Sequence, residues 1–228
     1  PLPPGQDNTG RGVAWDPKGK RVAVSSPDDG HLRIYDDSGA LLHDVPRYQD
    51  AKGLTGVAWR PTGDRIVTIG ARITLHDAEG TPITQWMHRP ESREGNQLLL
   101  CVAWHPSGAF FVVGDYGTEA DDPVLQFWSA DGDLIKSVPL EGDAELRNIS
   151  WNPDGSRFAT ASRNIAIWTA DGELEFKAPA PDLLWGVAWH PENDTLLTTD
   201  IVGRITLWNE RAEPVESIRE PQLEPADD

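Results

Sequence analysis

The chain has 228 residues and a formal net charge of −17 at pH 7, with 37 Asp and Glu against 20 Lys and Arg. A surface of this charge repels nucleic-acid phosphates and anionic membranes, so the composition argues against both as partners. The 19 Pro and 21 Gly indicate many turns. No apolar run approaches the roughly 20 residues of a membrane-spanning helix.

The one cysteine, Cys101, excludes an intramolecular disulfide. It stands where Gly12, Gly56 and Gly186 stand in other copies of a repeat described below, so we interpret it as a packing residue. No motif that would activate a thiol surrounds it. Cysteine usage and the absence of a visible signal peptide favour a cytoplasmic location.

In chain order, residues 1–10 are rich in Pro and polar residues and predict a flexible lead-in. A repeated phrase follows, in which an apolar residue, a small residue and Trp precede a turn containing Pro. Successive Trp residues of this phrase lie 38 to 47 residues apart, a period typical of repeat arrays. The five copies are Gly12–Pro17, Gly56–Pro61, Cys101–Pro106, Asn148–Pro153 and Gly186–Pro191.

Each phrase opens a set of four short segments that predict β-strands separated by tight turns. In the first repeat these are Gly12–Trp15, Arg21–Ser25, Leu32–Tyr35 and Leu41–Val45. Pro presets φ at the start of a turn, and Gly accepts the positive φ that follows. In the fifth repeat, Asn193-Asp194 replaces the Gly of the first turn, and these residue types also tolerate a left-handed backbone.

Five units of four antiparallel strands predict an all-β protein. One sheet of twenty strands is implausible, whereas a β-propeller with one four-stranded blade per repeat stacks each apolar face on the next. We expect a single domain over residues 11–218 and an acidic, disordered tail over 219–228. The predicted blades cover residues 11–46, 55–87, 100–139, 148–178 and 186–218.

The phrase Val-Ala-Trp-His-Pro-Ser-Gly at residues 102–108, followed by a strand ending in Phe-Trp, resembles divergent WD-repeat propellers of a bacterial type. The segment Trp151–Gly155 also resembles repeats of TolB-type propellers. The Trp-Asp pair of the WD family survives only as Tyr35-Asp36 and His76-Asp77, and its Gly-His pair is missing. We therefore do not expect the hydrogen-bond network that these pairs form in the family to be intact.

The resemblance leaves two architectures open, because WD-repeat domains most often have seven blades. The chain forms either a five-bladed ring or part of a larger propeller. A part would expose two blade faces, and it would then self-associate or pair with another chain. Eight of the ten Trp residues recur at fixed repeat positions, so we expect them to pack in the core. They are Trp15, Trp59, Trp104, Trp128, Trp151, Trp168, Trp189 and Trp208.

Variable connections between the second and third strands, and between blades, should meet at one edge of the blades. Insertions gathered on one face of a repeat protein usually mark its binding surface. Each of the side chains concerned could instead be an ordinary loop residue or, for Trp185, a packing residue between blades. The predicted partner-binding residues, of types that dominate protein interfaces, are Tyr48, Arg89, Arg93, Tyr116, Arg147, Arg163, Trp185 and Arg204.

No catalytic motif, zinc spacing or phosphate-binding loop is present, so the sequence predicts a non-catalytic scaffold for a protein or peptide, without a cofactor or metal. The acidic clusters lack calcium-loop spacing, and the best of them is 115–122. One alternative is a glycoside hydrolase using Asp115 and Asp200 as its carboxylate pair. Another is a carbohydrate-binding propeller, which would need the same polar and aromatic set in every loop, whereas these loops differ.

Overall fold

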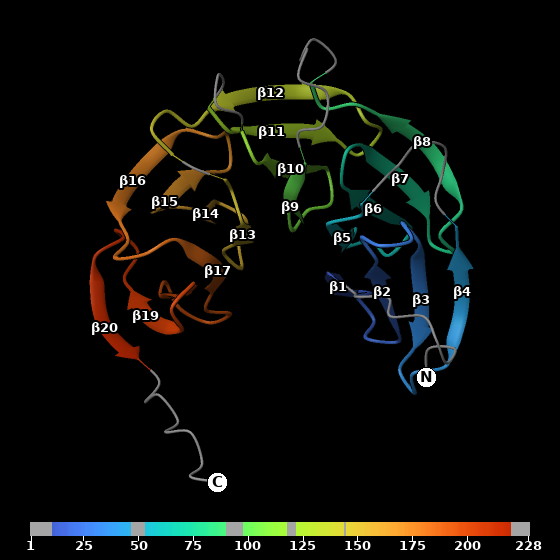
Figure 1. Cartoon of the computed structure of the whole chain (residues 1–228), viewed down its shortest axis with the longest axis horizontal. Helices are drawn as coiled ribbons and strands as arrows, with labels where there is room; N and C mark the ends of the chain where they lie inside the picture. The colour runs from blue at the N-terminus through green and yellow to red at the C-terminus, as the bar shows by residue number, and fades with distance from the viewer. Residues whose placement is uncertain (1–10, 47–52, 90–97, 118–121, 144, 220–228) are drawn as a thin grey trace, which may run out of the picture. The chain divides into compact units, whose positions relative to one another are not determined.

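The computed structural model describes residues 11–46, 53–89, 98–117, 122–143 and 145–219 (Figure 1). These residues form five four-stranded antiparallel sheets, each with its strands in chain order. One sheet corresponds to each sequence repeat, which confirms the predicted all-β propeller architecture. We call the sheets blades 1 to 5. The chain divides into two compact units, Pro1–Leu146 with blades 1 to 3 and Arg147–Asp228 with blades 4 and 5.

The strands are short, and a turn of a few residues separates the first strand from the second and the third from the fourth in every blade. Blades 1 to 3 contain β1 (Gly12–Trp15), β2 (Arg21–Ser25), β3 (Leu32–Asp36), β4 (Leu41–Val45), β5 (Gly56–Trp59), β6 (Arg65–Ile69), β7 (Ile73–Asp77), β8 (Pro82–Trp86), β9 (Leu99–Trp104), β10 (Phe110–Asp115), β11 (Val124–Ser129) and β12 (Leu134–Pro139). Blades 4 and 5 contain β13 (Asn148–Trp151), β14 (Arg157–Ala161), β15 (Asn164–Thr169), β16 (Leu174–Pro179), β17 (Leu184–Trp189), β18 (Leu196–Asp200), β19 (Arg204–Trp208) and β20 (Pro214–Arg219).

The turn between the third and fourth strands shows how the repeat tolerates exceptions. Gly39 has a φ of 85° there in blade 1, the left-handed conformation that the sequence predicts. In blade 5 the corresponding residue is Ala212, with a φ of 58°. The Asn193-Asp194 turn does not use the left-handed conformation that these residue types tolerate, because Ala212 is the one non-glycine residue with positive φ among those described. That turn is closed instead by the Asn193 carboxamide, which accepts a hydrogen bond from the Thr195 N–H at 3.0 Å.

Successive blades within each unit pack face to face. We call the face that meets the next blade in the chain the forward face, and the opposite one the backward face. In unit 2, the forward face of blade 4 and the backward face of blade 5 share one core cluster. Its members from blade 4 are Ala159, Ala161, Ile165 and Ile167, and those from blade 5 include Leu184, Val187, Trp189, Leu196 and Trp208.

Unit 1 repeats this arrangement twice. Ala23, Leu32 and Ile34 of blade 1 pack with Val57 and Trp59 of blade 2. The forward face of blade 2 packs in turn on blade 3. The alternation of side chains along each strand therefore gives every blade two apolar faces. In the second of these cores, the blade 2 residues Val67, Ile69, Ile73 and Leu75 meet Leu99, Trp104, Phe111, Val113 and Trp128 of blade 3.

The prediction that all eight repeated Trp residues pack in the core is wrong for Trp15, whose side chain is 57% exposed. Trp15 lies on the backward face of blade 1, and unit 1 contains no blade before this one. Trp151 is half-buried. The remaining six are buried, as expected: Trp59, Trp104, Trp128, Trp168, Trp189 and Trp208.

Candidate functional site at the loop edge of the blades

Every blade has two different edges. The antiparallel strand order places the first and third turns of a blade at one edge. The connection between its second and third strands lies at the opposite edge, together with the connections to neighbouring blades. We call this second edge the loop edge. It carries the variable connections that the sequence predicts as a binding surface.

Trp185 occupies a β-bulge at the loop edge of blade 5. Strand β17 begins at Leu184, two residues earlier than the sequence suggests, and its register with β18 shifts between Leu184 and Gly186. Trp185 is the extra residue, and its side chain is 54% exposed. A bulge bends the strand and redirects a side chain. In blade 3 the same bulge contains Leu100, which is only 8% exposed.

Arg147 stacks on Trp185. Its guanidinium carbon lies 4.3 Å from the centroid of the indole ring, within the range of a cation–π interaction. Arg147 and Trp185 each stand immediately before a copy of the repeat phrase, one blade apart. The Arg147 N–H donates to the Ala161 carbonyl at 2.9 Å, which fixes the backbone beside β14. The two stacked side chains therefore come from the same position of the repeat in blades 4 and 5.

In blades 3 and 5, the connection between the second and third strands is organised by an aspartate in the same way. Asp200 Oδ1 accepts hydrogen bonds from the N–H groups of Val202 at 3.1 Å and Arg204 at 2.9 Å. Asp115 Oδ1 accepts from Gly117 at 3.3 Å and Val124 at 2.8 Å. Each carboxylate thus fixes the backbone at the two ends of its connection.

The residue after each aspartate is presented to solvent. The Tyr116 N–H donates to the Leu98 carbonyl and the Ile201 N–H to the Leu183 carbonyl, both at 3.0 Å. Their side chains are 53% and 54% exposed. Sequence reasoning anticipated Tyr116 but missed Ile201 and its neighbour Val202, which is 42% exposed. The sequence signal was present, since Asp115-Tyr116 and Asp200-Ile201 occupy equivalent repeat positions.

Arg89 links the segment after β8 to both ends of the β10–β11 connection in unit 1. Its Nε lies 3.1 Å from Asp115 Oδ2, and its guanidinium donates to the Asp122 carbonyl at 2.9 Å. His88 Nε2 lies 3.4 Å from the same carboxylate oxygen, and the His88 carbonyl accepts from the Gln126 side-chain amide at 3.0 Å. Asp115 is fully buried and Arg89 is 9% exposed. This predicted rim residue therefore acts inside unit 1.

The remaining predicted residues that the structure describes take no part in the ion pair of Arg89 with Asp115. Arg204 pairs with Asp200 at 3.1 Å and with Asp182 at 3.4 Å. Arg163 is exposed in the two-residue turn between β14 and β15, where its carbonyl accepts from the Ala180 N–H at 3.1 Å. Tyr48 and Arg93 lie outside the described residues. We define the Trp185 surface of unit 2 as Arg147, Arg163, Trp185, Ile201, Val202 and Arg204.

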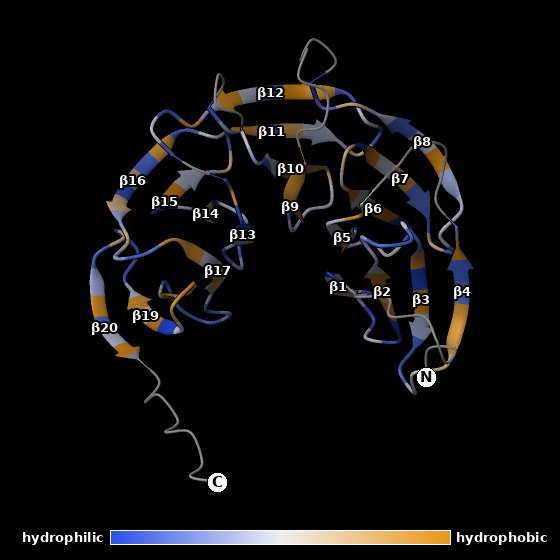
Figure 2. Cartoon of the chain, in the orientation of Figure 1, coloured by the Kyte–Doolittle hydropathy of each residue, from blue (hydrophilic) through white to orange (hydrophobic). Residues whose placement is uncertain are grey.

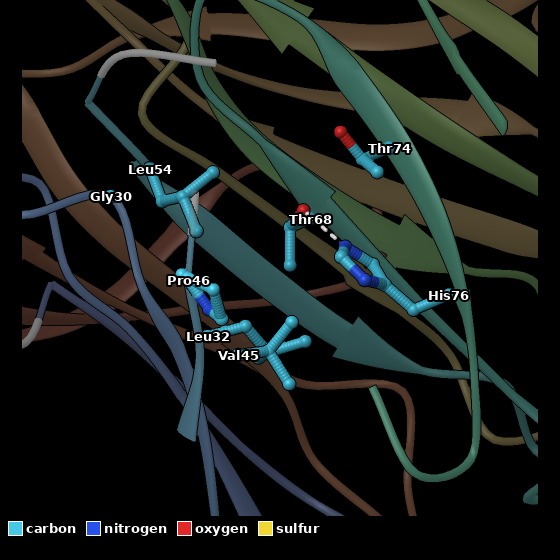
Figure 3. Close-up of a pocket in the computed structure, with 8 residues that line it drawn as sticks. All are labelled: Gly30, Leu32, Val45, Pro46, Leu54, Thr68, Thr74 and His76. Carbon is cyan, nitrogen blue, oxygen red and sulfur yellow. Dashed lines mark hydrogen bonds between the residues drawn. The ribbon is translucent and has the colours of Figure 1, made fainter. Parts of the chain in front are cut away.

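A small cavity between blades 1 and 2 has room for about one water molecule. Figure 3 shows that His76 points toward Thr68 beside it. His76 Nδ1 lies 2.9 Å from the Gly80 carbonyl, which can only accept, so Nδ1 carries the proton and Nε2 accepts from Thr68 Oγ1 at 2.9 Å. Burial lowers the pKa of His76 to about 4, so the ring is neutral at pH 7. The cavity is lined by Gly30, Leu32, Val45, Pro46, Leu54, Thr68, Thr74 and His76.

The geometry bears on the chemical alternatives. Asp115 and Asp200, the carboxylates of the hydrolase alternative, already accept backbone N–H groups and pair with arginines. Burial raises the pKa of the Cys101 thiol, which keeps it protonated and unreactive. Across the described ranges, no three His, Cys, Asp or Glu side chains gather as metal ligands. No helix in the part of the chain that the structure describes has the length and apolar character of a membrane span.

Comparison with known proteins places the repeats in context. Residues 10–36 match the family model described as WD domain, G-beta repeat. The chain is 23% identical over 197 residues to a probable cytosolic iron-sulfur protein assembly protein 1 from Botryotinia fuckeliana, covering 73% of this chain and 40% of that protein. It is 27% identical over 202 residues to rat WD repeat-containing protein 1, covering 86% of this chain and 25% of that protein.

A third relative matches a shorter region. Protein transport protein sec13 from Neurospora crassa is 30% identical over 108 residues, covering 41% of this chain and 36% of that protein. The chain thus spans between a quarter and two fifths of the length of these three relatives. All three are eukaryotic, so the expectations of a bacterial type and of a TolB-type repeat are not supported. The five four-stranded sheets give the chain a β-propeller architecture, and residues 10–36 are similar to a WD repeat.

Proposed function

We propose that this chain is a non-catalytic module that binds a protein or peptide at the loop edge of its blades, with the Trp185 surface as a principal contact. The observation that carries the proposal is the exposed Trp185 indole, raised on a β-bulge and stacked by Arg147. A large aromatic side chain held in one orientation loses little conformational entropy when a partner covers it. Trp and Arg are also enriched among the residues that dominate interface energetics.

The surroundings of Trp185 support the same proposal. Ile201 and Val202 add exposed apolar area at the same edge of blade 5. Arg163 adds positive charge to a protein whose net charge is −17, and Arg204 adds a charged group that is paired with Asp182 and Asp200. An apolar centre with a charged margin is the usual anatomy of a protein-binding patch. In unit 1, the exposed Tyr116 is presented by the same loop design and is a second proposed contact.

The relatives support the class of function. Their names describe a cytosolic iron-sulfur protein assembly protein, a protein transport protein and a WD repeat-containing protein. A scaffold role for this chain is proposed from that similarity together with the loop-edge geometry, because fold alone does not determine function. The predicted cytoplasmic location remains part of the proposal. No observation favours the hydrolase or carbohydrate-binding alternatives over it.

Affinity capture from a lysate of the source organism tests the proposal. The baits are the parent chain, Trp185→Ala, and the matched control Leu174→Ala, which removes a side chain that is 48% exposed on β16. We expect the parent and the control to retain the same protein, and Trp185→Ala to lose it while keeping the parent's circular dichroism spectrum. Equal retention by all three would show that the Trp185 surface is not the site. Arg89 is unsuitable for this test because its replacement would disturb a buried ion pair.

A further inference from the structure

The forward face of blade 5 is apolar and exposed. Leu197 pairs with Leu207, and Thr199 with Ile205, so these four side chains lie on one face of the sheet. Leu197 is 48% exposed and Ile205 is 36% exposed. Figure 2 shows hydrophobic residues recurring along β19 and β20.

The same positions are covered in the other blade of unit 2. The strand register relates four residues of blade 4, each 0% exposed, to Leu197, Thr199, Ile205 and Leu207. The backward face of blade 5 covers them and places Val187 and Trp189 in the same core cluster. The covered residues are Ala159, Ala161, Ile165 and Ile167.

A sheet face that stays exposed to solvent has a different composition from the forward face of blade 5. The solvent side of an antiparallel sheet normally carries polar residues, and the terminal unit of a repeat array has a polar outer face. Blade 5 instead retains Leu197, Ile205 and Leu207 at the positions that blade 4 uses for packing. Its forward face therefore has the composition of an interface.

The repeat itself shows what fits such a face. In each contact between blades within a unit, the covering sheet presents a Val and a Trp two residues apart on its first strand: Val57 and Trp59 in blade 2, Val102 and Trp104 in blade 3, and Val187 and Trp189 in blade 5. Blade 1 carries the same pair as Val13 and Trp15. These side chains are 70% and 57% exposed.

We propose that copies of this chain associate head to tail, with the backward face of blade 1 of one copy covering the forward face of blade 5 of the next. The contact repeats an interface already present between blades 4 and 5. Trp15 of one copy would take the place over Leu197 that Trp189 takes over Ala159. The pairing is heterologous, since two different surfaces meet, and a complex of two copies keeps one free surface of each kind for further association. This proposal does not depend on the Trp185 surface.

Sedimentation velocity over a concentration series tests the proposal with three variants. Val13→Lys disables the blade 1 face, Leu197→Lys disables the blade 5 face, and Leu134→Lys is a matched control on β12, where Leu134 is 51% exposed. We expect the parent and the control to rise above the 25.1 kDa monomer mass with concentration. Each face variant alone should remain monomeric, because neither has both surfaces.

The equimolar mixture of the two face variants is the decisive sample. Val13→Lys retains the blade 5 face and Leu197→Lys retains the blade 1 face, so the mixture should form a complex of two copies and no larger species. A parent that is monomeric at every concentration overturns the proposal. A mixture that stays monomeric, or a face variant that assembles like the parent, also overturns it. Circular dichroism and thermal unfolding verify that each variant is folded.

Discussion

Trp168 donates its indole N–H to Thr160 Oγ1 over 3.0 Å, and this bond recurs in modified form around the repeats. Trp208 donates to Thr198 at 2.8 Å. In blade 2 His76 stands in the Trp position, and the direction of the bond is reversed because Thr68 donates to His76 Nε2. In blade 3 Val113 replaces the Thr, and Trp128 Nε1 has no hydrogen-bond partner among the described residues.

Exchanging the residue types at this position should change stability in opposite directions. Thr160→Val leaves the buried Trp168 N–H without its acceptor and should lower the free energy of unfolding by about 1–3 kcal/mol. Val113→Thr offers Trp128 an acceptor and should raise it by about 1 kcal/mol. Urea unfolding followed by Trp fluorescence measures both. A loss of stability in Val113→Thr would show that the hydroxyl does not reach Trp128.

His76 should make stability depend on pH. Its pKa is lowered to about 4 from an ordinary value of 6.5, chiefly by burial. Between pH 6.5 and 4 the unfolded chain takes up a proton that the folded chain excludes, so stability present above this range is lost as pH falls, by about 3 kcal/mol. His76→Phe should flatten the unfolding free energy over this range, while costing about 1–3 kcal/mol at pH 7 through unpaired Thr68 and Gly80 groups.

The control for this measurement is His43→Gln, which changes an exposed histidine on β4 and should preserve the slope. Below pH 4 all variants should lose stability alike. The Arg33 guanidinium and the His31 N–H stabilise the charged carboxylate of Asp29 and hold its pKa at about 2. A parent slope between pH 6.5 and 4 that survives in His76→Phe would contradict the assignment to His76.

The ion pair between Arg89 and Asp115 should be much more sensitive to truncation than its counterpart in blade 5. Asp115→Ala leaves the Arg89 guanidinium buried without its carboxylate and should cost about 3–5 kcal/mol. Asp200→Ala should cost about 1–2 kcal/mol, because the Arg204 side chain is 21% exposed and can be hydrated. Asp115→Asn should fall between them, since its amide oxygen still accepts from Val124. Equal losses for the two alanine variants in urea unfolding would contradict the dependence on burial.

Gly114 is confined by packing rather than by its backbone angle. A Cβ atom there would lie 2.1 Å from Leu146 Cδ2 and 2.9 Å from Cys101 Sγ. Gly114→Ala should therefore lower the free energy of unfolding by about 3 kcal/mol through overpacking. Gly39→Ala is the control, because nothing lies within 4 Å of its added Cβ and only the positive φ opposes it, at about 1–2 kcal/mol. Thermal and urea unfolding compare the two, and a milder effect at Gly114 would mean that Leu146 moves aside.

Much of the fold could be predicted because it follows from local patterns. Period-2 alternation, the recurring Trp and the Pro and Gly turns are properties of neighbouring residues, and they predicted the strands and one sheet per repeat. The bulges at Leu100 and Trp185 were missed, since a bulge depends on how a strand pairs with its partner. For the same reason, the sequence predicted an exposed role for Arg89, whose burial depends on where Asp115 and Asp122 lie in the fold.

The sequence alone therefore determined the repeat, the all-β class and the edge on which the variable loops lie, because each depends on residues adjacent in the chain. Only the tertiary structure decided which loop residues face solvent and which apolar faces are covered. Trp185 and Trp15 are exposed, whereas Trp189 is buried, although Trp15 and Trp189 occupy the same position in two copies of the repeated phrase. Burial depends on the neighbouring sheet, and no local pattern contains that information.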